Sequence, residues 1–138
     1  MVKLIIGHKG SGKTKKLVEA VNTTTEQSHG NVVCIEKGET LNFSVTHKAR
    51  LINIETYGIS GFDAFYGMLC GICAGNYDVT DIFADATLKI VGKDFEHLCD
   101  FFDRVQALSE ETNTNFCFTV SADEAELPAK IFDIAEKY

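Results

Sequence analysis

The stretch Gly7-His-Lys-Gly-Ser-Gly-Lys13-Thr14 lies near the start of the chain and decides how the rest of the sequence is interpreted. It fits the pattern G-x-x-x-x-G-K followed by Ser or Thr at every fixed position. Its glycines, at positions 7, 10 and 12, let the backbone curl so that successive N–H groups point inward. Such a loop is suited to binding phosphate groups, and a glycine-rich turn that binds nothing is the alternative.

The segments on either side of this loop have the character that a phosphate site needs. Residues 2–6 form a short apolar run rich in β-branched side chains, which is typical of a buried strand. Residues 13–21 place Leu17, Val18 and Val21 on one face, which predicts a helix that the polar residues 22–25 would stop. The loop therefore connects a strand to a helix, whose N-terminus adds partial positive charge.

Strands and helices alternate along the remainder of the chain. Apolar runs predict further strands at 32–35, 51–54, 79–84 and 115–120. Apolar side chains at helical spacing predict helices over 61–74 and 94–111, Pro128 opens a last helix, and the polar segment 37–50 is an irregular connection. We expect a single α/β domain over residues 1–138, with three layers, a mainly parallel five-stranded sheet and helices on both faces.

The edge of this sheet selects the polar residues that can lie near the glycine-rich loop. Ligands of parallel sheets bind beyond the carboxyl ends of the strands. Asp85 follows strand 79–84 at that edge, whereas Asp81 lies about 13 Å away toward the other edge. The Thr14 hydroxyl is an expected Mg²⁺ ligand, and Lys13 would bridge the β and γ phosphates. An aspartate that only begins a turn is the alternative for Asp85.

The loop and the alternation of strands and helices resemble the P-loop NTPase superfamily, and the whole chain is similar to short bacterial ATP-binding proteins. The resemblance is close over the loop and its flanking segments, and beyond them it rests on the alternation alone. It implies ATP and Mg²⁺ as cofactors, and it implies that Asp85, at the end of an apolar strand, matches the superfamily's second motif and holds Mg²⁺ through water. ATP is preferred to GTP because the sequence lacks an N/T-K-x-D-like guanine signature. The implied nucleotide-binding residues are Gly7, His8, Lys9, Gly10, Ser11, Gly12, Lys13, Thr14 and Lys15.

The acid that would activate a nucleophile is not fixed by the sequence. Many ATPases of the superfamily place a glutamate directly after the motif aspartate, but Ala86 occupies that position here. Glu36 and Glu55 each follow a predicted strand and are the candidate catalytic bases. Lys13 and Asp85 are the other candidate catalytic residues. For Glu36 and for Glu55, a solvated loop acid is the alternative. Residues 119 and 121 could sense the γ-phosphate, although 121–124 also fits a helix capping box.

Arginine, which often neutralises charge in phosphoryl transfer, is scarce. Arg104 is expected to pair with Asp100 or Asp103, and Arg50 begins a strand at the edge away from the phosphates. The leading hypothesis is therefore a Mg-ATP-binding protein with slow hydrolysis. The alternatives are a small-molecule kinase that uses Glu36 or Glu55 as its base, and a nucleotide-dependent switch or subunit that acts through a homo-oligomer or a protein partner.

Several weaker patterns have structural explanations. Cys70 and Cys73 have C-x-x-C spacing without a second pair, which favours buried free thiols over zinc. Phe62, Phe65 and Tyr66 could stack an adenine, but their helical spacing favours core packing. Glycines at 67, 71 and 75 each cost helix stability, so we expect close approach by another backbone there.

Composition limits the remaining classes of function. With 138 residues, 45% of them hydrophobic, and one proline, the chain is expected to fold rather than to be disordered. A net charge of −7 argues against bulk binding to nucleic acid or to an anionic membrane, although residues 1–16 hold five lysines and no acid. Five cysteines and no apolar run of membrane-spanning length predict a reduced, cytoplasmic protein.

Overall fold

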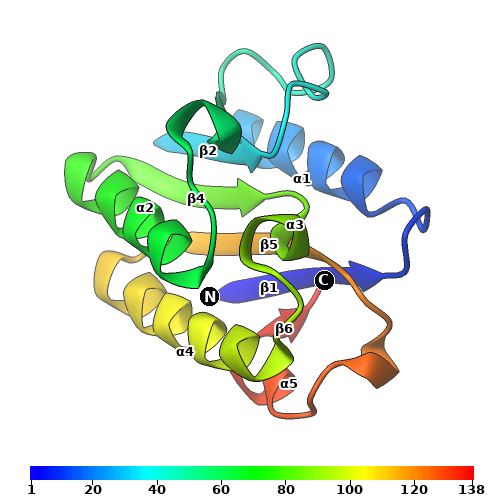
Figure 1. Cartoon of the computed structure of the whole chain (residues 1–138). Coiled ribbons are helices and arrows are strands. Elements are labelled where there is room, and N and C mark those ends of the chain that lie inside the picture. The colour runs from blue at the N-terminus through cyan, green and yellow to red at the C-terminus, as the bar shows by residue number, and fades with distance from the viewer.

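A computed structural model describes residues 1–138, and in it a central sheet lies between helices on both faces (Figure 1). The strands follow the order β3-β2-β4-β5-β1-β6, and every neighbouring pair is parallel. Their carboxyl ends therefore share one edge. The strands are β1 (Val2–Gly7), β2 (Asn31–Glu36), β3 (Arg50–Asn53), β4 (Val79–Ala84), β5 (Asn115–Ser121) and β6 (Glu136–Lys137).

The expected count of five strands is wrong, because β6 adds a sixth. The expected parallel pairing is confirmed, and it holds for every neighbouring pair of strands. Strand β6 pairs its two residues with Lys3 and Leu4 of β1. Both of its residues are exposed, so this edge strand carries no apolar run that the sequence could reveal. The backbone N–H of Tyr138 continues the pairing by donating to the Leu4 carbonyl at 2.8 Å.

Helices divide unequally between the two faces of the sheet. Helix α1 (Lys13–Gln27) packs with the segment 37–50 on one face, and the other helices gather over the opposite face (Figure 1). These helices are α2 (Phe62–Gly75), α3 (Thr87–Val91), α4 (Phe95–Thr112) and α5 (Ile131–Ile134), and single 3₁₀ turns η1 (Ile54–Tyr57) and η2 (Glu124–Glu126) follow β3 and β5. None of the helices combines the length and apolar character needed to cross a membrane.

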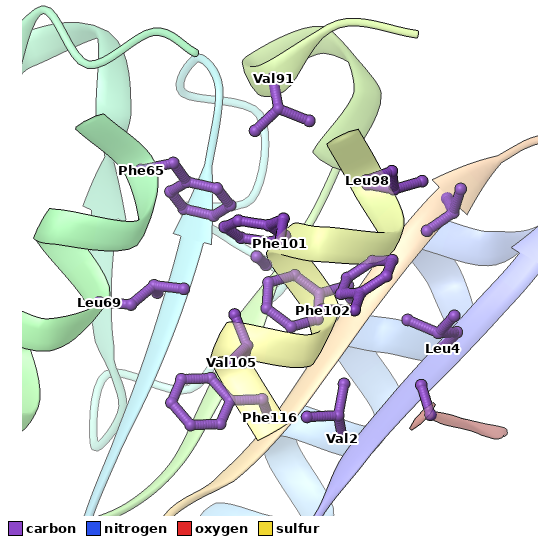
Figure 2. Close-up of a cluster of buried hydrophobic side chains, with 14 of the residues drawn as sticks. Val2, Leu4, Phe65, Leu69, Val91, Leu98, Phe101, Phe102, Val105 and Phe116 are labelled. Atoms are coloured by element: carbon purple, nitrogen blue, oxygen red, sulfur yellow. The ribbon is translucent and has the colours of Figure 1, made fainter. Parts of the chain in front are cut away.

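The larger core lies between the sheet and the helices α2 and α4. Figure 2 shows Phe65 of α2 beside Phe101 of α4, and their rings stack with centroids 5.6 Å apart. Phe102 packs against Phe118 of β5 with a centroid distance of 5.3 Å. Core packing is thus confirmed for Phe65, while Phe62 and Tyr66 are half-buried against the same cluster.

Helix α1 is longer than its sequence pattern indicates. The polar residues 22–25 do not stop it, and the helix continues to Gln27. Asn22 donates to the Ser44 carbonyl at 2.9 Å and accepts from the Thr46 N–H at 2.8 Å, which ties the helix to the segment 37–50. Thr25 donates to the Val21 carbonyl at 2.7 Å, so its hydroxyl remains compatible with helical backbone.

The glycines of α2 have open space beside them. A Cβ added at Gly67, Gly71 or Gly75 would meet no heavy atom within 4 Å, so the expected close approach of another backbone is absent from this chain. On the same helix Cys73 is buried as expected, whereas Cys70 is half-buried.

Candidate functional site

The glycine-rich loop (residues 7–14) connects the carboxyl end of β1 to the start of α1. Gly12 precedes the helix with φ at 86°, a left-handed conformation that side chains rarely adopt. Gly7 has φ at 157°, which L side chains rarely adopt, and a Cβ there would lie 2.5 Å from the Ser11 hydroxyl oxygen. The Gly7 N–H also donates to the Ala122 carbonyl at 3.1 Å, which fixes the start of the loop to the segment after β5.

Lys13 lies beneath this loop with only 8% of its surface exposed. Its ammonium donates to the His8 carbonyl at 2.8 Å and approaches the Ser11 hydroxyl at 3.5 Å. No carboxylate forms an ion pair with it. A nearly buried positive charge held only by neutral oxygens favours an anion at the same place.

The Asp85 carboxylate is held by hydroxyl groups from two other elements. Thr14 of α1 donates to its Oδ2 at 3.1 Å, and Thr119 of β5 donates to its Oδ1 at 2.6 Å. The Thr119 oxygen in turn accepts from the Ala86 N–H at 2.8 Å. Strand β5 lies between β1 and β4, so Thr119 reaches the aspartate at the end of β4. A hydroxyl and a carboxylate oxygen side by side are ligands that suit Mg²⁺.

Ala86, where many ATPases carry a glutamate, turns the chain sharply toward α3. Its φ of 55° is left-handed, which is uncommon outside glycine and is found at constrained sites. Ala86 lines the cleft together with Leu88, and these two are its only hydrophobic side chains.

A cleft of about 740 Å³ opens over the carboxyl edge of the sheet. It contains five lysines and one acid, Asp85. The glycine-rich loop and α1 supply three of these lysines, and α3 with the residues after it supplies Lys89 and Lys93. The lining residues are Lys9, Gly10, Gly12, Lys13, Thr14, Lys15, Asp85, Ala86, Leu88, Lys89, Lys93, Thr119 and Ser121.

Most of the predicted loop residues line this cleft. Gly7, His8 and Ser11 do not, and His8 instead points its ring toward Asp123, with Nδ1 and Oδ1 3.6 Å apart. Lys89 and Lys93 were not predicted from the sequence, because α3 has five residues and no detectable periodicity. The one feature of the sequence that could have indicated these two lysines is their position a few residues after Asp85, which follows β4.

Glu36 is not a solvated loop acid, because its side chain is buried and accepts hydrogen bonds from the segment 37–50. It is buried, with 3% of its surface exposed. One carboxylate oxygen accepts from the Thr40 N–H and hydroxyl at 2.9 and 3.0 Å, and the other accepts from the Leu41 N–H at 3.2 Å. Glu36 does not line the cleft, and its contacts anchor the start of the segment 37–50.

Glu55 also lies away from the cleft. It is exposed within η1, where its backbone N–H donates to the Asn53 side chain at 3.1 Å. Thr119 and Ser121 do line the cleft. The capping box expected at 121–124 is wrong, because the box forms two residues later, where the Asp123 N–H donates to Glu126 at 2.9 Å.

Neither arginine contributes to the cleft. The expected pairing of Arg104 with Asp100 or Asp103 is wrong, since Arg104 pairs with Asp63 at 3.2 Å and lies 3.9 Å above the Tyr66 ring. Arg50 is the first residue of β3 and so lies at the amino edge of the sheet, as predicted.

Two buried thiols, Cys34 of β2 and Cys117 of β5, lie within the sheet. Burial first, and then the neighbouring Asp85 carboxylate, raise the pKa of the Cys34 thiol to about 12. Burial raises the pKa of Cys117 to about 12 as well. Both groups remain protonated near neutral pH and are therefore poor nucleophiles.

Comparisons with known proteins support the architecture. Searches with protein-family models and among curated proteins find no match. Among solved structures, the chain is similar to the flagellar accessory protein FlaH from Methanocaldococcus jannaschii, with a TM-score of 0.59 and 16% sequence identity. The match covers 96% of this chain and 65% of the FlaH chain. At that identity the likeness shows the fold alone, which is α/β with helices on both faces of a parallel sheet.

Proposed function

We propose that this chain binds the Mg²⁺ complex of a nucleoside triphosphate, and ATP in particular, in the cleft at the carboxyl edge of the sheet. One observation carries the proposal: the Thr14 hydroxyl meets the Asp85 carboxylate at 3.1 Å beside Lys13, which is nearly buried and has no ion-pair partner. Lys13 and Thr14 are adjacent at the start of α1, Asp85 follows β4, and a Mg²⁺-bound polyphosphate needs all three types of group.

Each side chain has a definite task in this proposal. Thr14 and Asp85 would hold the metal ion, which when bound neutralises charge between the phosphate oxygens. Thr119 keeps the Asp85 carboxylate oriented through its 2.6 Å hydrogen bond. Lys13 would exchange the His8 carbonyl for phosphate oxygens, and the loop would add backbone N–H donors.

Hydrolysis to ADP and phosphate would be slow. Asp85 is the only carboxylate that lines the cleft, and its oxygens already accept from Thr14 and Thr119. No arginine lines the cleft to stabilise developing charge, a contribution that reaches about 10³ to 10⁵ in rate elsewhere. A kinase with Glu36 or Glu55 as its base gains no support from their contacts, and a switch that needs a partner stays a prediction.

Isothermal titration calorimetry with Mg-ATP tests the proposal. We expect Lys13→Ala to weaken binding by at least about tenfold, which corresponds to about 1.4 kcal/mol. Lys16→Ala is the matched control, because Lys16 is exposed on the same helix and does not line the cleft. The proposal fails if Mg-ATP and Mg-GTP do not bind at millimolar concentration, or if both variants bind like the unaltered chain.

A further inference from the structure

The lysines of the cleft are unusual for this acidic chain. The sequence carries a net charge of −7, yet the cleft contains five lysines and a single aspartate. None of these lysines forms an ion pair with a carboxylate. Elsewhere on the surface, Lys130 and Lys137 each pair with a glutamate.

A nucleotide alone does not balance this charge. Five lysines and one aspartate give the cleft a formal surplus of four positive charges. A Mg²⁺-bound triphosphate carries about two negative charges near neutral pH, because each ionised phosphate adds its charge and the ion removes two. About two positive charges remain, which is close to the charge of one phosphate group.

Two of the five lysines, Lys89 and Lys93, lie apart from the glycine-rich loop, and they define what we call the second wall of the cleft. Lys9, Lys13 and Lys15 belong to the glycine-rich loop and the first turn of α1, where the nucleotide is expected. Lys89 belongs to α3 and Lys93 follows it closely, and Figure 1 shows α3 at the carboxyl ends of β4 and β5, apart from the connection between β1 and α1.

This second wall is held in place by side-chain and backbone contacts. Lys37 donates to the Lys89 carbonyl at 3.1 Å, which fixes α3 and adds a further positive charge nearby. At the start of α3, the Ala86 N–H donates to Thr119 at 2.8 Å. Only Ala86 and Leu88 offer apolar surface in the cleft, so a polar ligand fits it better than an apolar one.

We propose that Lys89 and Lys93 form a second oxyanion site, which takes a phosphate group while the glycine-rich loop holds the nucleotide. The inference rests on the proposed function, because it assigns the other lysines to the nucleotide. The phosphate group is either inorganic phosphate, which hydrolysis would release, or that of a small phosphomonoester. In both cases two ammonium groups on one wall bind an anion of about two charges.

The experiment uses the full chain saturated with a non-hydrolysable ATP analogue and Mg²⁺, with inorganic phosphate titrated by calorimetry. We expect phosphate to bind, and the double variant Lys89→Gln and Lys93→Gln to weaken its binding by at least about tenfold. The same variant should keep its affinity for the analogue within about twofold. A charge-matched control replaces Lys16 and Lys48 with Gln, since both are exposed and neither lines the cleft.

The outcomes separate this inference from the proposed function. If the unaltered chain does not bind the analogue, the proposed function fails and the second site falls with it. If the analogue binds but phosphate does not, or if the control weakens phosphate as much, only the second site is overturned. A tenfold loss of analogue affinity in the Lys89 and Lys93 variant also overturns it, because the lysines then serve the nucleotide. A parallel titration with glycerol phosphate identifies the source, since tighter binding than inorganic phosphate indicates an organic ligand.

Discussion

At the scale of single residues, two buried threonines near Asp85 show how differently one side-chain type can be used. The Thr119 hydroxyl donates to Asp85 and accepts from the Ala86 N–H. The Thr87 hydroxyl, one residue after Ala86, is buried and has no hydrogen-bond partner. A buried hydroxyl without a partner lowers the free energy of unfolding, whereas a buried hydroxyl with two partners raises it.

Replacing each threonine with the isosteric valine should therefore have opposite effects. We expect Thr119→Val to lower the free energy of unfolding by about 1 to 2 kcal/mol, because the Ala86 N–H and an Asp85 oxygen lose their partner. Thr87→Val should leave the free energy unchanged or raise it by up to about 1 kcal/mol. Urea denaturation of the two variants measures both values, and an equal loss in both would contradict the assignment of partners.

At the scale of elements, the long apolar runs were predictable, and two of the short elements were not. The strand over 79–84 has the bounds that its apolar run predicted, because a buried parallel strand must be apolar on both faces. The helix over Phe95–Thr112 was predicted to within one residue by its apolar spacing. Strand β6 and helix α3 were missed, since two exposed residues and five residues are too short to show a period.

The residues of the candidate site also divide into those that a sequence pattern could locate and those that it could not. Lys13, Thr14 and Asp85 were predictable, because a contiguous loop pattern and the rule of the carboxyl edge locate them. Lys89 and Lys93 were not, because they belong to an unpredicted helix. The burial of Glu36 could not be predicted either. Its partners, Thr40 and Leu41, belong to an irregular segment whose backbone path no sequence pattern indicates.

The segment 37–50 should depend on the carboxylate at the end of β2. Glu36→Gln is expected to lower the free energy of unfolding by about 1 to 3 kcal/mol, because the new amide group would face N–H donors that need an acceptor. Glu55→Gln is the control, since Glu55 is exposed, and it should change the free energy by less than about 0.5 kcal/mol. Thermal or urea unfolding of both variants makes the comparison. Equal effects would show that Glu36 does not anchor this segment.

At the scale of the whole molecule, charge is separated in space. The chain as a whole carries −7, while the cleft holds a surplus of lysines over acids. Repulsion among the excess acids opposes compactness, and the lysines of the cleft attract anions. Dissolved salt weakens both the repulsion among acids and the attraction of anions. The repulsion lowers the stability of the fold, whereas the attraction strengthens ligand binding.

Salt should consequently change stability and binding in opposite directions. Raising NaCl from about 0.1 M to about 1 M shortens the Debye length from about 10 Å to about 3 Å. We expect the midpoint of thermal unfolding of the nucleotide-free chain to rise by a few degrees, as self-repulsion is screened. Over the same range the affinity for Mg-ATP should fall by about tenfold, as measured by calorimetry. An affinity that does not respond to salt would count against a site built mainly on charge.

The order of the strands also fixes when the cleft can form. Strand β1 is the first in the sequence, yet both of its neighbours, β5 and β6, come from the last quarter of the chain. Val2 is paired with Phe116, so closing that pairing requires a loop of nearly the whole polypeptide. Pairings between such distant residues form slowly. The glycine-rich loop, which follows β1, is therefore among the last segments to be held in its native shape.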